Sequence, residues 1–200
     1  MHVTKALALL LVLGSACIAT SHGKENPMVE ITTSKGSIVL ELYPDQAPVT
    51  VSNFLAYVDS GFYDGTVFHR VIRDFMIQGG GFDQEMTRKE TLAPIANEAA
   101  NGLRNERGTI AMARTMVPNS ATSQFFINTA DNRSLDYRDD TPQGIGYCVF
   151  GRVTKGADIV DSIQSVRTGV SAGMRDVPQE AVIITSIKRL EQQTEATAAE

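Results

Sequence analysis

Alternating apolar and polar positions recur in short runs along the chain and predict a protein built mainly of strands. Residues 28–33 and 37–43 alternate in this way and are rich in β-branched side chains, which is typical of strands. Ser34, Lys35 and Gly36 lie between the two runs and predict a hairpin turn. Further strands are expected at residues 67–72, 75–78, 108–113, 123–127, 147–153 and 181–190.

Two other segments have the apolar spacing of a helix. Pro48 suits the first turn of a helix and Gly61 suits its end, so a helix is expected over residues 48–60. Residues 156–166 carry three apolar side chains at helical spacing. Many short strands with two flanking helices favour a β-barrel or a β-sandwich over a parallel α/β sheet. Because both helices need a surface to cover, we expect a closed barrel that they cap at its ends.

The beginning of the chain differs from the rest and predicts an export signal. Lys5 is followed by the unbroken apolar run 6–13 and then by small residues, which is the order found in a secretory signal peptide. The apolar run is too short to span a bilayer. The expected organisation is a signal peptide at 1–21, a linker at 22–27, a folded domain at 28–190 and a polar tail at 191–200.

The two cysteines carry different expectations. Cys148 lies in an apolar run and is expected to be a buried small hydrophobe, which leaves the exported chain without an internal disulfide. Residues 14–17 read Gly-Ser-Ala-Cys and partly resemble a bacterial lipoprotein cleavage site. An acyl chain on Cys17 is therefore the alternative to simple cleavage, and it would tether the protein without a membrane span.

Composition argues against two classes of protein. The formal net charge is −5 and the sequence contains no run of Lys or Arg, so a nucleic-acid-binding surface is not expected. Only three histidines occur, and two of them, His2 and His22, fall in the expected leader or linker. No His and Cys cluster with ligand spacing remains, so no metal site is expected.

Three short motifs also need an interpretation. The glycine run 79–81 lacks the rest of a phosphate-binding loop and is expected to end a strand. Residues 169–173 match the G-x-S-x-G nucleophile elbow, but no His follows Ser171, so a flexible loop is expected instead. Residues 132–134 match a glycosylation sequon, which has meaning only in a host with an endoplasmic reticulum.

Three segments that occur in order resemble the signatures of the cyclophilins. The first is FHRVIRDFMIQGG at 68–80. The second joins GTIAMA at 108–113 to SQFFI at 123–127 and is followed by Leu135 and Asp136. A third, VFGRV, occupies 149–153, and the match extends from about residue 28 to residue 190. The chain thus resembles a cyclophilin-type peptidyl-prolyl cis–trans isomerase, and its signal peptide and short 82–107 connection are similar to the periplasmic branch in Gram-negative bacteria.

The resemblance implies a fold and a set of site residues. The family fold is a closed eight-stranded antiparallel β-barrel capped by two α-helices. Arg70 matches the catalytic arginine of the family, and Gln78 matches a residue that hydrogen-bonds the substrate backbone. Ser134 stands where many relatives carry an aromatic residue, so weak binding of cyclosporin is expected. Positions matching those that contact the proline or the residue before it are Phe75, Met76, Ala113, Arg114, Gln124, Phe126, Leu135 and Tyr147.

The chemistry of proline isomerisation suits this set of residues. Rotation disturbs only the partial double bond of the amide, so no nucleophile, metal or cofactor is needed and none is expected. A guanidinium such as that of Arg70 can bind the twisted amide better than either planar form, and only such differential binding accelerates the step. A proline-binding chaperone or adaptor with little catalysis is the alternative function.

The resemblance and the leader together predict partners and location. The expected partners are proline-containing unfolded or partly folded polypeptides, with no nucleic acid and no membrane span, and the expected state is a monomer. The expected location is the periplasm, where the isomerase would assist the folding of exported proteins. A lipid-anchored envelope protein and a protein of the secretory pathway are the alternatives.

Overall fold

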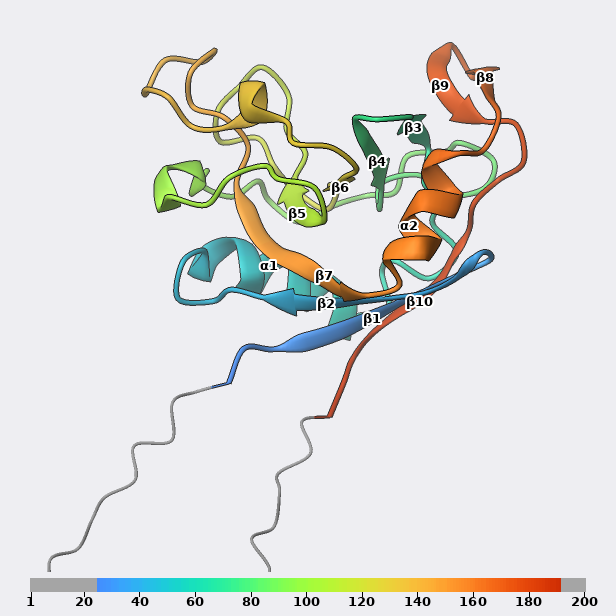
Figure 1. Ribbon diagram of the computed structural model, residues 1–200, viewed down its shortest axis with the longest axis horizontal. Helices are drawn as coiled ribbons and strands as arrows, with labels where there is room; N and C mark the ends of the chain where they lie inside the picture. The colour runs from blue at the N-terminus through green and yellow to red at the C-terminus, as the bar shows by residue number, and fades with distance from the viewer. Residues whose placement is uncertain (1–24, 192–200) are drawn as a thin grey trace, which may run out of the picture.

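The structure is a computed structural model that describes residues 25–191 (Figure 1). The predicted signal peptide, Cys17, the first part of the linker and all of the polar tail beyond Glu191 lie outside these residues. The strands of the main sheet are β1 (Met28–Thr33), β2 (Gly36–Leu42), β3 (Arg70–Ile72), β4 (Met76–Gly79), β5 (Thr109–Met112), β6 (Phe125–Asn128), β7 (Val149–Lys155) and β10 (Ile184–Arg189). The other elements are helices α1 (Pro48–Asp59) and α2 (Ala157–Gln164), the 3-10 helices η1 (Ala99–Asn101) and η2 (Arg133–Leu135), and strands β8 (Thr168–Ser171) and β9 (Met174–Pro178).

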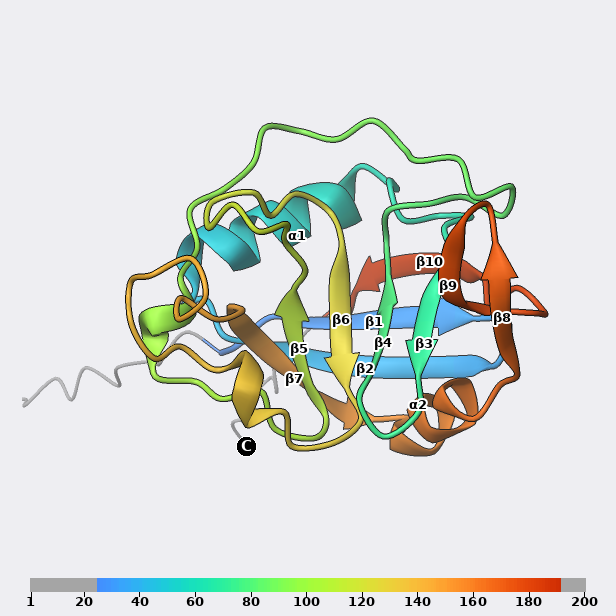
Figure 2. The same ribbon diagram turned by 90° about the horizontal axis from the view of Figure 1, so that it is seen from above.

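The main sheet is antiparallel throughout and runs in the order β10–β1–β2–β7–β5–β6–β4–β3. Figure 2 shows that it curls over itself, so that β3 to β6 lie in front of β1, β2 and β10. The helices α1 and α2 lie on opposite sides of this curled sheet. The predicted architecture, mainly β with eight antiparallel strands and two helices, is therefore confirmed. Within residues 25–191 no helix is long and apolar enough to cross a membrane.

The expected closure of the barrel is wrong, because the edge strands β3 and β10 do not pair along their length. They meet through an isolated bridge between Val67 and Ile183, flanked by backbone hydrogen bonds of 2.9 and 2.7 Å. The strands expected at 67–72 and 181–190 each begin three residues late, since their first residues form this bridge and not the ladders. The sheet is therefore an open half-barrel whose edges touch at one point. On its other side, β3 contacts β9.

An aromatic core fills the space enclosed by the curled sheet. Helix α1 begins at Pro48, as predicted, and buries Phe54 completely. The ring of Phe54 lies 5.4 Å from Tyr63, 5.7 Å from Phe125 and 5.2 Å from Phe150, measured between ring centroids. Burial of each ring contributes roughly 1.5–3 kcal/mol. This core lies on one face of the sheet, which leaves the opposite face of β3 to β6 to carry a pocket.

The flexible loop expected at 169–173 is instead part of a hairpin formed by β8 and β9. Its turn residues Ala172 and Gly173 both have positive φ, 49° and 77°, which suits a tight two-residue hairpin turn. Ser171 lies exposed just before this turn, and a strand follows it rather than a helix. The local geometry of a nucleophile elbow is therefore absent at Ser171.

Candidate active site

Nine of the ten predicted site residues line one pocket of about 180 Å³. The strand register explains how they meet: Arg70 lies opposite Gln78, Gln78 opposite Phe126, and Phe126 opposite Ala111. The strands β3, β4, β6 and β5 thus present one continuous row across the sheet. The lining residues are Arg70, Phe75, Met76, Gln78, Ala113, Arg114, Phe126, Leu135 and Tyr147.

One side of the pocket is apolar, and we call Phe75, Met76, Phe126, Leu135 and Tyr147 the apolar wall. Met76 and Phe126 are 2% and 4% exposed and belong to a small cluster separate from the main core. This follows from strand alternation, because neighbours such as Phe125 and Ile77 point into the main core. The rings of Phe126 and Tyr147 meet edge to face at 5.7 Å. The wall offers an apolar slot that makes no polar demands on its occupant.

The other side is polar: Arg70 and Gln78 line it, and Asp176 and Gln124 contact these two from outside the pocket, so we call the four residues the polar rim. Arg70 Nε lies 3.8 Å from Asp176 Oδ2, and 44% and 43% of the two side chains are exposed. Gln78 Nε2 donates to Gln124 Oε1 at 2.9 Å. Gln124 is the one predicted residue that does not line the pocket, since it bonds to Gln78 from beside Gly81, where a Cβ would overlap it.

Arg114 connects the pocket to the loop that precedes β7. Its Nε donates to Gly146 O at 2.8 Å, and its guanidinium carbon lies 4.6 Å from the centre of the Tyr147 ring. A guanidinium stacked on an aromatic ring contributes about 0.5–1 kcal/mol at an exposed site. Arg114 therefore holds Tyr147 in place at the edge of the apolar wall.

A chain of three buried asparagines, Asn105, Asn128 and Asn132, supports the apolar wall, and the sequence analysis missed it. Asn105 Nδ2 donates to Leu135 O at 3.1 Å and to Tyr147 O at 3.3 Å. Its Oδ1 accepts from Asn128 Nδ2 at 3.2 Å, and Asn128 Oδ1 accepts from Asn132 Nδ2 at 2.7 Å. A polar residue in a buried strand is the sequence signal that could have revealed the chain, because Asn128 ends the apolar run of β6.

Asn132 completes the chain and gives the predicted sequon another role. Its Nδ2 donates to Phe75 O at 2.7 Å, and the residue is 8% exposed. Thr129 N donates to the same carbonyl at 3.0 Å. The side-chain amide that a sugar would occupy is thus buried and bonded, so the folded structure does not present Asn132 for glycosylation.

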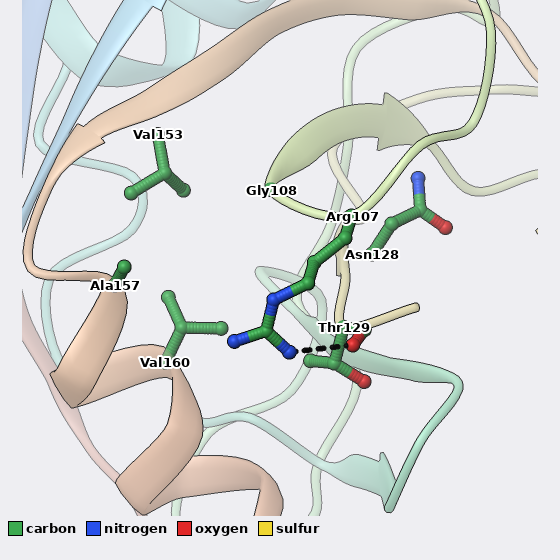
Figure 3. A pocket seen from close by; sticks show the side chains of 7 residues that line it. All are labelled: Arg107, Gly108, Asn128, Thr129, Val153, Ala157 and Val160. Carbon is green, nitrogen blue, oxygen red and sulfur yellow. Dashed lines mark hydrogen bonds between the residues drawn. The ribbon is translucent and has the colours of Figure 1, made fainter. Parts of the chain in front are cut away.

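A second hollow lies between α2 and the start of β5 (Figure 3). Its volume is about 30 Å³, enough for about one water molecule. Arg107 lies along it, with Nη1 donating to Thr129 O at 2.9 Å and Nη2 donating to both carboxylate oxygens of Asp161 at 2.8 Å. The hollow is too small for a peptide, and Arg107 serves to tie α2 to the end of β6.

The interior also holds two titratable side chains that line no part of the pocket. Burial lowers the pKa of His69 from 6.5 to about 4, and burial raises the pKa of the Cys148 thiol from 9.0 to about 11. Both groups are therefore neutral at pH 7, and the expected burial of Cys148 is confirmed. Among residues 25–191, no three His, Cys, Asp or Glu side chains gather where they could hold a metal ion.

Comparison with known proteins relates the chain to one family. A family model described as cyclophilin type peptidyl-prolyl cis–trans isomerase/CLD matches residues 28–189. The chain is 63% identical over 162 residues to peptidyl-prolyl cis-trans isomerase cyp18 of Streptomyces antibioticus, covering 81% of this chain and 98% of that protein. It is 56% identical over 160 residues to peptidyl-prolyl cis-trans isomerase B of Escherichia coli K12, covering 80% of this chain and 98% of that protein.

Solved structures agree with the sequence relatives. A crystal structure of a cyclophilin type isomerase from Cryptosporidium parvum superposes with a TM-score of 0.68 at 26% identity, covering 84% of this chain and 99% of that one. A second structure of that protein, in the presence of the dipeptide Ala-Pro, gives a TM-score of 0.67 at 27% identity, covering 82% and 99%. The chain belongs to the cyclophilin-type peptidyl-prolyl cis–trans isomerase family.

Proposed function

We propose that Arg70 is the catalytic residue of this isomerase and that the apolar wall binds the proline ring of the substrate. One observation carries the proposal: the cross-strand row puts a half-exposed guanidinium and a buried aromatic ring on either side of Gln78. A proline ring seated against Phe126 and Met76 directs its amide nitrogen towards Arg70. The pocket thus combines a binding surface for the ring with a charged donor for the amide.

The reaction requires only that the twisted amide be bound better than the planar forms. Rotation about the Xaa–Pro bond has a barrier of roughly 18–20 kcal/mol and takes tens to hundreds of seconds without a catalyst. In the twisted state the proline nitrogen becomes pyramidal and gains a lone pair, to which Arg70 donates. Gln78 donates to a backbone carbonyl of the substrate and fixes the part of the peptide that does not rotate. Arg70 acts on charge that develops during rotation, so it favours the transition state over the ground states.

The substrates that we propose are proline-containing segments of unfolded exported polypeptides, and the place of action is the periplasm. This proposal rests on the leader, where Lys5 precedes the apolar run 6–13. Expression of the full chain in a Gram-negative host, followed by cell fractionation, tests it. Recovery in the periplasmic fraction as a shortened chain supports the proposal, whereas an uncleaved cytoplasmic chain contradicts it. A Cys17→Ser variant that moves from the membrane to the periplasmic fraction would instead indicate a lipid anchor.

Exchange NMR on a short Xaa–Pro peptide tests the catalytic role, because it measures cis–trans exchange directly and needs no coupled protease. Arg70→Ala is expected to lower kcat/KM by about 100-fold, the size of effect seen when one aligned donor is removed from an active site. Arg73→Ala is the matched control, since Arg73 lies on the same β3–β4 hairpin and donates to Ser165 O outside the pocket. Near-normal exchange in Arg70→Ala would contradict the mechanism. Peptide binding without acceleration by the unmodified protein would favour a proline-binding module.

A further inference from the structure

Three arginines line a further pocket, larger than the proline-binding pocket, at the end of the molecule that carries η1 and η2. Arg104, Arg133 and Arg138 line this hollow of about 430 Å³ together with Asp136 and Tyr137. We call it the arginine pocket. The segment 133–147, gold to orange in Figure 2, lies at the opposite end of the molecule from the β8–β9 hairpin. The arginine pocket therefore lies far from the β8–β9 hairpin, which carries Asp176 of the polar rim.

The lining of the arginine pocket has an excess of positive charge. Its lining holds three guanidinium groups and one carboxylate, although the chain as a whole carries a net charge of −5. Within residues 25–191, the side chains of Arg104 and Arg133 make no hydrogen bond or ion pair, and that of Arg138 donates only to a backbone carbonyl, Gln143 O, at 3.0 Å. Clustered guanidiniums with free donors bind carboxylates well, because their planar forks match carboxylate geometry.

The single lining carboxylate does not neutralise these arginines. Asp136 Oδ1 accepts from Asn105 N at 2.7 Å and from Asn105 Nδ2 at 3.3 Å, which holds the carboxylate against the asparagine chain, and its one negative charge leaves two of the three positive charges of the lining without a counter-charge in the lining. The next carboxylates along the chain, Asp139 and Asp140, do not line the pocket: Thr141 N donates to Asp139 at 2.9 Å, and Tyr137 Oη donates to Asp140 at 2.9 Å. The pocket therefore retains positive charge that an incoming anion can meet.

The arginine pocket adjoins the proline-binding pocket through η2. Arg133 and Asp136 line the arginine pocket, and Leu135 between them lines the proline-binding pocket. This one short turn therefore separates the two pockets. An extended polypeptide advances about 3.3 Å per residue. A substrate whose proline rests on the apolar wall can thus place a side chain a few residues away in the arginine pocket.

We propose that the arginine pocket is a substrate subsite for an acidic side chain, Asp or Glu, located a few residues from the proline. The inference rests on the proposed function, because it assigns the apolar wall to the proline ring. The guanidiniums of Arg104 and Arg133 bind the carboxylate, and Arg138 adds to the local positive potential. The isomerase therefore prefers Xaa–Pro bonds in acidic segments of unfolded chains over those in neutral segments.

The test uses capped peptides of equal length with one proline, carrying either Glu or Gln at one position between one and four residues away on each side. Exchange NMR gives kcat/KM, and NMR titration gives Kd, for the protein and for the Arg104→Gln/Arg133→Gln double variant. At low salt the Glu peptide is expected to exceed its Gln counterpart by about three- to tenfold at the favoured position, the range of a few exposed ion pairs. In the double variant the ratio is expected to fall to about one, and salt is expected to reduce it in the unmodified protein.

Controls separate this inference from the proposed function. Lys188→Gln, on β10, removes one positive charge elsewhere and is expected to keep the preference for Glu peptides. Gln peptides are expected to react normally with the double variant, because neither arginine lines the proline pocket. Equal kcat/KM and equal Kd for Glu and Gln peptides at every position would overturn the subsite and leave the isomerase role intact. If no peptide were accelerated, the isomerase role would fail, and the Kd ratio alone would still decide the subsite.

Discussion

The two sides of the proline pocket are built in different ways. The apolar wall is buried at Met76 and Phe126 and partly buried elsewhere, and the asparagine chain fixes it from behind by bonding the backbone carbonyls of Phe75, Leu135 and Tyr147. The polar rim has little support of this kind: Arg70 is 44% exposed along its side chain and meets Asp176 only at 3.8 Å. The wall thus has one fixed shape, whereas the rim can adjust.

This difference matches what each side has to do. A rigid apolar wall holds the proline ring in one orientation, and ring binding needs only shape and dryness. The amide changes its geometry during rotation, so the donor that follows it benefits from freedom to move. We therefore expect substitutions in the asparagine chain to lower the free energy of unfolding. Substitutions in the polar rim are expected to lower turnover with little effect on stability.

The largest effect is expected from Asn105→Ala, which removes support from the wall. Leu135 O, Tyr147 O and Asn128 Nδ2 each lose one hydrogen bond, although Leu135 O still accepts from Tyr147 N and Asn128 Nδ2 still donates to Thr109 Oγ1. Each lost hydrogen bond contributes about 0.5–1.5 kcal/mol, so the free energy of unfolding is expected to fall by about 2–4 kcal/mol. Urea denaturation measures this loss, and KM for an Xaa–Pro peptide is expected to rise as the wall loosens.

An exposed asparagine provides the control for Asn105→Ala. Asn119 accepts one hydrogen bond from Asn97 N at 2.9 Å on the surface, so Asn119→Ala is expected to cost less than about 1 kcal/mol. A similar stability loss in both variants would mean that the buried asparagine chain has no special role.

A smaller loss of stability is expected at acidic pH, and its source is His69, the residue next to Arg70. Burial lowers the pKa of His69 to about 4, so below pH 6.5 the unfolded chain takes up a proton that the folded protein does not. Stability attributable to this group is complete above pH 6.5, falls as the pH drops towards 4, and then levels off. The loss between pH 7 and pH 5 is expected to be about 2 kcal/mol.

Urea denaturation at pH 7, 6 and 5 measures this dependence on pH. A His69→Gln variant is expected to show a flatter profile over the same range, because Gln does not titrate. Parallel profiles for the variant and the unmodified protein would rule out His69 as the source of the acid sensitivity.

The smallest effect is expected from Asp176→Asn in the polar rim. The exposed ion pair to Arg70 contributes only a few tenths of a kcal/mol, so kcat/KM is expected to fall about two- to threefold with the melting temperature unchanged. Glu180→Gln is the control, because it removes an ion pair to Lys35 of the same 3.8 Å length away from Arg70. A loss of stability without a loss of turnover in Asp176→Asn would reverse the comparison between wall and rim.

Local elements of the fold could be predicted from the sequence, whereas contacts between distant segments could not. The helix that begins at Pro48 was predictable because its apolar face and first turn are encoded within twelve residues. The β8–β9 hairpin escaped prediction because only Val177 and Pro178 of its strand residues are buried and the strands show no alternation, and its turn depends on positive φ at Ala172. Closure of the sheet also escaped, since it depends on how the segments around Val67 and Ile183 meet.

The candidate site divides in the same way. The residues that line the proline pocket were found through their resemblance to a family, because positions such as Arg70 and Leu135 are distant in sequence and have no local pattern in common. Gln124 was placed in the pocket by the same resemblance, but it bonds to Gln78 and does not line the pocket. Asn105 was missed because it lies in a polar stretch where burial has no signal in the sequence.

The pairing of the first and last strands sets the order in which the protein can fold. Val29 on β1 lies opposite Arg189 on β10, so β1 has both of its neighbours, β10 and β2, only after nearly the whole domain has been synthesised. At about 5–20 residues per second, a ribosome needs roughly 8–30 s to make the intervening chain. During that time β1 has one free edge and the core is open to water. The sheet of this isomerase can therefore be completed only once its last strand is available, and a chain stopped before β10 cannot complete it.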